Sequence, residues 1–274
     1  MDTTISTYVP RVTSNDLREQ ITEHIRELAE ATDAARMSAE MLRYLEVCSR
    51  FHHYSPFNIW LILSAMPEAT RVAGFKKWRG LKRYVRKGEK GIPILAPIFA
   101  PVEVEEGQEE EKLVGFKTVY VFDVSQTDGE PLPEPPDWKS PEQNAELTHR
   151  LQAYAQSKGI EVVVKELTGN IQGASMGGVI FLAPQAGTKT LVHEIAHEIL
   201  HHVENAPTDK RIQELEAEAV AYVVGKHFGL EGLSSPNYVA LHGADAEMIM
   251  GHMERIRSTS TEIIRAIEGD NEIS

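Results

Sequence analysis

Apolar residues recur at steps of three and four positions near the start of the chain, where they would share one face of a helix. In residues 14–32 these positions are Leu17, Ile21, Ile25 and Leu28. Ser14 or Asn15 can cap this helix, because a short polar side chain accepts hydrogen bonds from the free amides of the first turn. Two more helices are predicted at residues 38–51 and 58–65.

The pattern changes after residue 91, where β-rich runs replace the helical periodicity. Residues 91–105 and 116–127 are bounded by Gly, Pro and acids and are rich in apolar residues that favour strands, which predicts two strands. The acidic stretch 105–112 between them predicts a solvated hairpin tip. Prolines and acids crowd residues 127–143, and this composition is typical of a linker.

Beyond the proline-rich stretch, helical and β patterns alternate. The predicted elements are a helix at 142–158, strands at 160–166 and 174–183, and helices near 188–202, 213–228 and 244–267. We therefore expect an α+β fold of two domains, each with its own core. The first domain would span 1–126, the linker 127–143, and the second domain 144–274, with a helix packed on a small mixed sheet.

Composition supports a folded protein without a membrane partner. Of the 274 residues 42% are apolar and 25% are charged, as in soluble proteins, and no apolar run approaches the length of a membrane span. The first residues lack the basic-then-apolar order of a signal peptide. The single cysteine, Cys48, excludes an internal disulfide and fits a reducing compartment. We expect a cytoplasmic protein.

Charge is distributed unevenly along the chain. The net charge is −13, yet residues 71–90 hold nine of the 28 basic residues and a single acid, Glu89. This segment therefore carries +8 and the rest of the chain −21. A local basic patch can bind a polyanion while the remaining surface stays acidic.

Aromatic residues are interleaved with these cations, a combination that suits single-stranded nucleic acid because cations follow phosphates and rings stack on unpaired bases. The candidate DNA-binding residues are Phe75, Lys76, Lys77, Trp78, Arg79, Lys82, Arg83, Tyr84, Arg86 and Lys87. The alternative is a solvated charged face whose aromatic side chains, Trp78 and Tyr84 among them, turn into the core.

The stretch TKTLVHEIAHEILHH at residues 188–202 contains HExxH in two overlapping frames. Two histidines four positions apart on a helix can share one divalent ion, and the intervening Glu can take a proton from water. We favour the frame His193-Glu194-xx-His197, because it lies inside the helix. The frame beginning at His197 ends on the last turn, where helices fray. Glu194 is the candidate catalytic base.

A third protein ligand would leave the fourth position of the metal open for water. Glu214 and Glu218 lie four positions apart in QELEAEAVAYVV, so they share one face of the next helix. We assign Glu214 as the ligand and Glu218 as a carboxylate that holds a ligand histidine, although these two roles could be exchanged. The metal is expected to be Zn²⁺, with Mn²⁺ or Fe²⁺ as alternatives.

Three further expectations concern the surroundings of this site. Residues 177–184, GGVIFLAP, would form an edge strand to which a peptide adds by β-augmentation. His201 and His202 are expected to lie at the helix end or beside the ligands rather than to bind the metal. Together with Tyr222 they are weak candidates for stabilising an oxyanion.

Long ordered blocks make the chain resemble the ArdC-type antirestriction proteins of conjugative plasmids. In the first half they are YSPFNIWLIL, PEATRVAGFKKWRGLKRYVRKGEKGIPILAPI and VFDVSQTDGEPLPE, and in the second half TLVHEIAHEILHH and ELEAEAVAYVVGKHFGL. The resemblance implies an N-terminal single-stranded DNA-binding domain and a C-terminal zincin-like metallopeptidase domain related to the ImmA/IrrE peptidases. It also maps the HExxH motif to His193, Glu194 and His197, and the paired acids to Glu214 and Glu218.

The expected function is therefore an antirestriction-type protein that binds single-stranded DNA nonspecifically and acts as a zinc metalloendopeptidase on an unidentified protein or peptide. One alternative is a DNA-binding antirestriction module whose metal site is structural or latent. Another is a regulatory metallopeptidase that cleaves a repressor-like protein.

Overall fold

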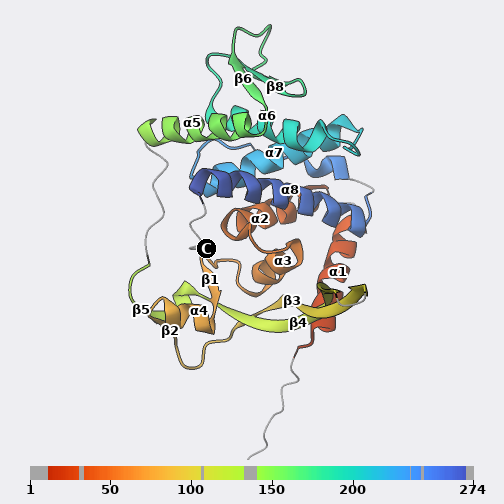
Figure 1. Ribbon diagram of the computed structural model, residues 1–274, viewed down its shortest axis with the longest axis vertical. Helices are drawn as coiled ribbons and strands as arrows, with labels where there is room; N and C mark the ends of the chain where they lie inside the picture. The colour runs from red at the N-terminus through yellow and green to blue at the C-terminus, as the bar shows by residue number, and fades with distance from the viewer. Residues whose placement is uncertain are drawn as a thin grey trace, which may run out of the picture.

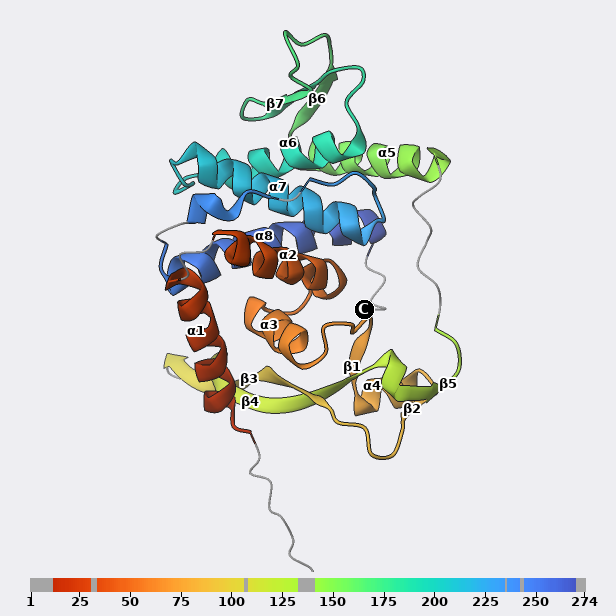
Figure 2. The same cartoon turned by 180° about the vertical axis from the view of Figure 1, so that it is seen from behind.

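Helices and small sheets are stacked in layers along the long axis of the molecule (Figure 1). A small sheet lies at one end, helical layers fill the middle, and a long curved hairpin closes the other end, as the view from behind also shows (Figure 2). The structure is a computed structural model, and it describes residues 12–30, 34–105, 108–132, 141–234, 236–241 and 244–269.

The first half of the chain combines three long helices with strands. Its elements are α1 (Ser14–Glu30), α2 (Ala34–Phe51), α3 (Pro56–Ala65), β1 (Val72–Gly74), α4 (Phe75–Gly80), β2 (Arg83–Val85), β3 (Ile92–Glu105), β4 (Gln108–Asp123), the 3-10 turn η1 (Val124–Gln126) and β5 (Thr127–Gly129). One antiparallel sheet has the order β1-β4-β3, and β2 pairs with β5 in a second. The predicted hairpin is confirmed, but β4 begins at Gln108, so most of the acidic stretch 105–112 belongs to the strands.

The second half holds a small mixed sheet and four long helices. Its elements are α5 (Pro141–Ser157), β6 (Glu161–Val164), β7 (Gly173–Ser175), β8 (Val179–Leu182), α6 (Thr188–His201), α7 (Lys210–His227), the 3-10 turn η2 (Tyr238–Leu241) and α8 (Ala246–Glu268). The α+β class is as expected. Within the described part of the chain, no helix combines the length and the apolar character needed to cross a bilayer.

A shared core joins the two halves, which differs from the expected pair of separate cores. The buried apolar residues form one cluster that runs from Leu17 in α1 to Ile267 in α8. Helices α1 to α3 pack directly against α7 and α8, and the indole Nε1 of Trp60 lies 3.5 Å from Sδ of Met253. The helices of the first half bury their apolar faces against the helices of the second half. Without this contact, apolar side chains of both helical layers would be exposed to solvent.

The predicted linker, residues 127–143, is not free along its whole length. Its first residues form β5, which pairs with β2, and α5 begins at Pro141. Residues 133–140, like residues 1–11, lie outside the described residues. The side chain of Arg83 also donates to Thr127 of β5, to its Oγ1 over 2.8 Å and to its carbonyl over 3.0 Å, which adds to the pairing with β2.

The strand predicted at 174–183 is in fact a hairpin. Gly177 and Gly178 have φ values of +74° and +93°, a left-handed conformation that glycine adopts without strain, and they turn the chain between β7 and β8. The sheet order is β6-β8-β7, with β8 parallel to β6 and antiparallel to β7. The expectation that residues 177–184 form an edge strand is therefore wrong, because β8 is the central strand, between β6 and β7.

A buried side chain fastens the curved hairpin to the helical layer. Asn58 in α3 donates from Nδ2 to the carbonyl of Leu95 over 2.9 Å, and its Oδ1 accepts from the Leu95 amide over 2.8 Å. Strand β3 is an edge of its sheet, so the outward backbone groups of Leu95 would otherwise be buried without partners.

Replacing this amide tests its contribution to stability. Asn58→Leu leaves two backbone groups of Leu95 unsatisfied, and we expect the free energy of unfolding to fall by about 2–4 kcal/mol. Urea denaturation monitored by circular dichroism measures the change. Thr13 and Asp16, and not Asn15, make the capping hydrogen bonds at the start of α1. The exposed Asn15 therefore offers a control, and Asn15→Ala should stay within about 0.5 kcal/mol. Equal values for both variants would contradict the role given to Asn58.

Candidate metal centre

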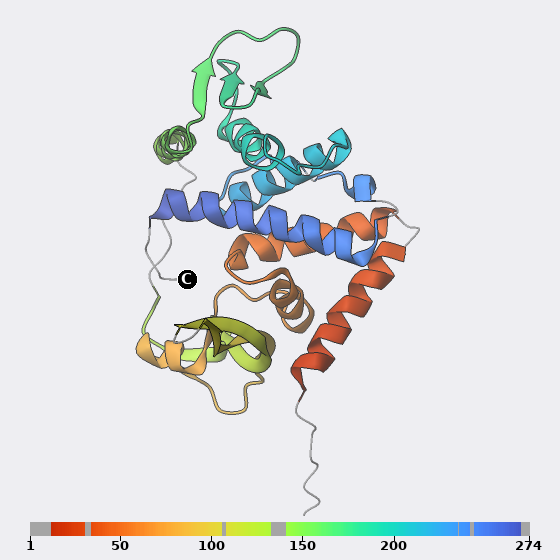
Figure 3. The same cartoon turned by 45° about the vertical axis from the view of Figure 1, so that its right-hand side comes forward.

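Helix α6 packs against other elements on two opposite faces, so most of its ionisable side chains are shielded from solvent. Its apolar residues, among them Leu191 and Ile195, are buried in the common core. The β7–β8 hairpin lies over the opposite face, and Figure 3 shows the small sheet standing above the layer of α5 and α6. Glu194 and Glu198 are consequently only 7% exposed, rather than facing solvent as an amphipathic helix would require.

Three possible metal ligands converge between α6 and α7. The Nε2 atoms of His193 and His197 are 3.0 Å apart. One carboxylate oxygen of Glu214 lies 3.5 Å from Nε2 of His193, and the other lies 3.5 Å from Nε2 of His197. Among the described residues, these three form the group whose ligand atoms all lie within 4.8 Å of one another.

The spacing of these atoms fits a divalent ion. Ligand bonds of about 2.0–2.2 Å in a tetrahedral site place neighbouring ligand atoms roughly 3.3 Å apart, and the observed separations bracket that value. Two imidazole nitrogens and a carboxylate oxygen are also the donor set of catalytic zinc sites. The side chain of Glu214 is 66% exposed, so solvent can reach the site from this side.

A second carboxylate lies beside the first histidine. Glu218 Oε2 lies 3.3 Å from Nδ1 of His193, and its Oε1 accepts from Nζ of Lys189 over 2.9 Å. Burial favours the neutral form of Glu218, but His193 and Lys189 outweigh it and lower its pKa to about 2. Glu218 is therefore an anion beside the outer nitrogen of His193, the position that a supporting carboxylate occupies.

The pKa of His193 and the pKa values of these two acids depend on one another. Burial alone would lower the pKa of His193, but the carboxylates of Glu214 and Glu218 raise it to about 9. Hydrogen bonds from His193 and His197 hold the pKa of Glu214 far below its usual range. The site therefore concentrates negative charge around the two imidazoles, which favours a bound cation.

Glu194 lies against the edge strand of the small sheet. A Cβ atom on Gly173 would come within 2.5 Å of Glu194 Oε1, so only glycine permits this approach. Burial raises the pKa of Glu194 above its ordinary value, while the two neighbouring imidazoles oppose the shift. A carboxylate that binds a proton more readily is better suited to general-base chemistry near neutral pH.

The glutamate of the second HExxH frame, Glu198, has a structural role. Glu198 Oε1 accepts hydrogen bonds from Ser175 Oγ (2.7 Å) and from the amides of Met176 (3.0 Å) and Gly177 (2.9 Å), and Oε2 accepts from the amide of Gly178 (2.6 Å). These bonds lower its pKa against the effect of burial. Glu198 therefore fastens the β7–β8 turn to α6 and has no free geometry for catalysis.

A buried network behind the ligands was missed by the sequence analysis. His201 lies with Nδ1 2.9 Å from Nδ1 of His197 and with Nε2 3.0 Å from Glu216 Oε2. Glu216, which is fully buried, also contacts Nδ1 of His252 at 2.7 Å and accepts from Nε of Arg255 over 2.9 Å. This chain of contacts fixes the imidazole of His197 from the side opposite the proposed metal.

The remaining candidates near the site have other partners. His202 Nε2 lies 2.8 Å from Ser175 Oγ, at the hairpin turn. The hydroxyl of Tyr222 donates to Glu46 of α2 over 3.3 Å. Neither contact involves the ligand cluster, and an oxyanion role for these two side chains stays a prediction.

The aromatic residues of the basic segment, residues 71–90, differ in their exposure to solvent. Trp78 is 2% exposed, and its Nε1 donates to the carbonyl of Phe122 over 2.9 Å. It therefore belongs to the core, and its assignment as a base-stacking residue is wrong. Its burial follows from its place on α4, a short helix whose inner face packs on β1 and β4. The ring of Phe75 is 50% exposed and that of Tyr84 is 58% exposed, so both are accessible for stacking.

The cations of this segment also differ. Arg83 donates to Thr127, and Arg86 pairs with Glu89 at 2.8 Å and with Asp128 at 3.4 Å, so both arginines hold local structure. The exposed basic residues are Lys76, Lys77, Arg79, Lys82, Lys87 and Lys90, together with Arg86, which is held by its two acidic partners. A DNA strand would meet these side chains first.

The buried network gives a stability prediction. Glu216→Ala leaves Arg255 and two histidines without their shared anion, so the free energy of unfolding should fall by about 3 kcal/mol or more. Urea denaturation of the metal-free protein measures this. Glu231 is exposed, and Glu231→Ala should change the value by less than about 0.5 kcal/mol. A Glu216→Ala loss as small as the control would show that the network contributes little.

Comparisons with known proteins match a family model in the first half and similar proteins over most of the chain. Residues 15–122 match the family model described as the N-terminal domain of anti-restriction factor ArdC. An uncharacterized protein of Bacillus anthracis is 28% identical over 96% of this chain and 54% of its own length, so the chain spans about half the length of this relative.

Two crystal structures of the antirestriction ArdC protein from the R388 plasmid are also similar. The metal-free structure has a TM-score of 0.49 at 18% identity, and covers 78% of this chain and 85% of that one. The Mn(II)-bound structure has a TM-score of 0.47 at 17% identity, covering 80% and 86%. The family relationship identified by these comparisons is that residues 15–122 match the N-terminal domain of ArdC.

Proposed function

We propose that the chain is an antirestriction-type protein that binds single-stranded DNA and carries a zincin-like metallopeptidase site. The observation that carries the peptidase proposal is the convergence of His193, His197 and Glu214 beside the buried carboxylate of Glu194. The match of residues 15–122 to the ArdC N-terminal domain supports the antirestriction class.

The metal expected here is Zn²⁺, with Mn²⁺ or Fe²⁺ as alternatives that the same donor set accepts. When bound, a divalent ion would supply a Lewis acid that acidifies water and polarises a peptide carbonyl. His193, His197 and Glu214 would hold it, and Glu218 would orient the ring of His193. The contact of His197 with His201 would hold the second ring in the same way.

Glu194 moves the proton in this mechanism. Its carboxylate accepts a proton from the attacking water and passes it to the leaving amine, which requires that the group is held close to the scissile bond. Of the two edge strands, β6 and β7, the substrate backbone would lie along the outer edge of β7, because Glu194 packs against Gly173 of this strand. Main-chain hydrogen bonds to an edge strand are sequence-tolerant, so a broad range of unfolded segments is expected to bind.

DNA binding would use the exposed part of residues 71–90. The lysines and Arg79 at this surface neutralise phosphates, while Phe75 and Tyr84 stack on bases. This surface lies beside β2 and β5, and the small sheet next to α6 lies at the other end of the molecule (Figure 1). A DNA strand and a peptide can therefore occupy the protein together.

Separating metal binding from chemistry tests the peptidase proposal. Zinc-loaded wild-type protein should cleave fluorescein-labelled casein, and Glu194→Gln should reduce the rate at least about 100-fold while keeping one bound metal per chain. His197→Ala should lose both metal and cleavage. His149→Ala is the control, since this exposed histidine of α5 lies outside the ligand cluster, and it should keep both.

Casein cleavage by Glu194→Gln at the wild-type rate would refute the role of Glu194. The alternative function, a DNA-binding antirestriction module with a structural or latent metal site, has its support in the family match, which is confined to residues 15–122. Full protection of incoming DNA in cells that carry Glu194→Gln would favour this alternative.

Charge reversal tests the DNA surface. Lys82→Glu combined with Lys87→Glu removes two exposed cations, so the dependence of log affinity on log salt should become shallower by roughly 1.4 for single-stranded DNA. Fluorescence anisotropy with a labelled oligonucleotide measures this slope. Lys165→Glu combined with Lys210→Glu makes the same charge change on exposed lysines of the second half and should leave the slope almost unaltered. The same slope change in both double variants would place the binding surface elsewhere.

A further inference from the structure

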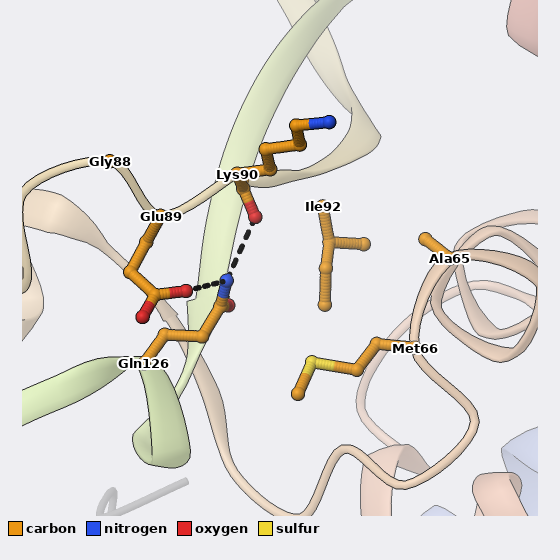
Figure 4. A pocket seen from close by; sticks show the side chains of 8 residues that line it. Ala65, Met66, Gly88, Glu89, Lys90, Ile92 and Gln126 are labelled. Atoms are coloured by element: carbon orange, nitrogen blue, oxygen red, sulfur yellow. Dashed lines mark hydrogen bonds between the residues drawn. The ribbon is translucent and has the colours of Figure 1, made fainter.

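A pocket of about 500 Å³ opens beside the basic segment, between the end of α3 and the connection from β2 to β3. This volume lies within the roughly 300–1,000 Å³ of small-molecule pockets. Figure 4 shows Glu89 and Gln126 on one side of it, Met66 on the other, and Ile92 between them. One wall is thus polar and the other apolar.

The polar wall contains the only acid of residues 71–90. An anion inside a phosphate-binding strip weakens binding of a polyanion, so a role limited to phosphate contact does not account for Glu89. Its Oε1 accepts from Nη2 of Arg86 over 2.8 Å and from Nε over 3.1 Å, and its Oε2 accepts from Nε2 of Gln126 over 3.1 Å. These hydrogen bonds, that of Gln126 first, lower the pKa of Glu89, so the group is an anion at neutral pH.

The carboxylate is held in place with acceptor capacity left over. An ionised carboxylate offers about four acceptor positions, and the bonds above from described residues use three of them. Gln126 is itself fixed, because its Nε2 also donates to the carbonyl of Lys90 over 2.9 Å and its Oε1 accepts from the amide of Asp123 over 2.9 Å. The wall of the pocket therefore presents a rigid acceptor on Oε2.

We propose that this pocket receives one unpaired base of the bound DNA strand and selects bases that carry an amino group. The exocyclic amine would donate to Glu89 Oε2, as cytosine N4 does to acidic side chains. The base would contact the thioether of Met66, which packs well on aromatic rings, and the side chain of Ile92. The exposed Lys90 at the rim would meet the adjacent phosphate.

Uracil and thymine carry an oxygen where cytosine carries its amine, and an oxygen facing a carboxylate is repelled. The protein should therefore bind oligo(dC) more tightly than oligo(dU) of the same length, although the two ligands have the same number of phosphates. A hydrogen bond to a charged group corresponds to a preference of about tenfold or more. This inference rests on the proposed binding of single-stranded DNA and adds a base preference to it.

The test is fluorescence anisotropy of the full chain with labelled oligo(dC) and oligo(dU) at one salt concentration. Wild type should prefer oligo(dC) about tenfold. Glu89→Gln should bind oligo(dU) more tightly than wild type, because an anion is removed, and the preference should fall to about twofold or less. Met66→Trp, which fills the pocket, should weaken oligo(dC) binding and leave oligo(dU) binding nearly unchanged.

Asp128→Asn is the matched control, since Asp128 also faces Arg86, at 3.4 Å, but does not line the pocket. It should strengthen the binding of both ligands and keep the tenfold ratio. Equal wild-type affinities for the two ligands would overturn the base preference and leave the proposed DNA binding intact, as would an equal loss of preference in Asp128→Asn and Glu89→Gln. If wild type binds neither ligand, the proposed DNA binding fails and this inference fails with it.

Discussion

Burial of the ionisable side chains of α6 is the constraint that organises this structure. A buried carboxylate is strongly destabilising unless it is paired and hydrogen-bonded, and α6 carries two of them, Glu194 and Glu198, beside the partly buried imidazoles of His193 and His197. The chain meets this requirement from two directions. The β7–β8 turn directs three backbone amides at Glu198, and α7 supplies the acids that face the histidines. The proposed metal cluster is therefore assembled by the same contacts that make the helix stable.

The common core extends this constraint to the first half of the chain. Helix α7 packs against α6 on one side and α2 on the other, and His227 at its end lies with Nδ1 2.9 Å from the carbonyl of Ser49. Residue Thr261 of α8 donates to the carbonyl of His52 over 2.6 Å with its hydroxyl. The helix that carries Glu214 and Glu218 is thus also a wall of the N-terminal layer. Because the two halves share these helix contacts, a structural change in one half directly alters the packing of the other. Two domains joined only by a linker would not be coupled in this way.

Sequence periodicity predicted the helices well, because their apolar faces follow the helical repeat. The bounds of α1 and α6 are confirmed to within two residues, whereas α2 begins four residues earlier than predicted, at Ala34. Short strands were harder to predict. The run 174–183 lacks a proline or a charge, but its Gly177-Gly178 pair is a turn signal that the prediction overlooked, and the positive φ of both glycines shows the turn.

The proposed metal site was also only partly predictable from the sequence. Motif spacing brought His193, His197 and Glu214 into consideration, but it could not reveal which acids are buried. Glu216 was not among the predicted site residues, although an acid between Leu215 and Ala217 in an apolar helix is a signal that its side chain needs buried partners. Those partners, His252 and Arg255, come from a helix 36 or more residues away, and no local pattern predicts this contact. Composition likewise could not separate the buried Trp78 from the exposed Tyr84.

Anomalous X-ray diffraction from crystals grown with zinc, recorded on both sides of the zinc absorption edge, tests the central claim most directly. We predict one strong anomalous peak about 2.0–2.2 Å from Nε2 of His193, Nε2 of His197 and a carboxylate oxygen of Glu214. A peak bound instead by His201 or His202, or the absence of any peak between α6 and α7, would contradict the account.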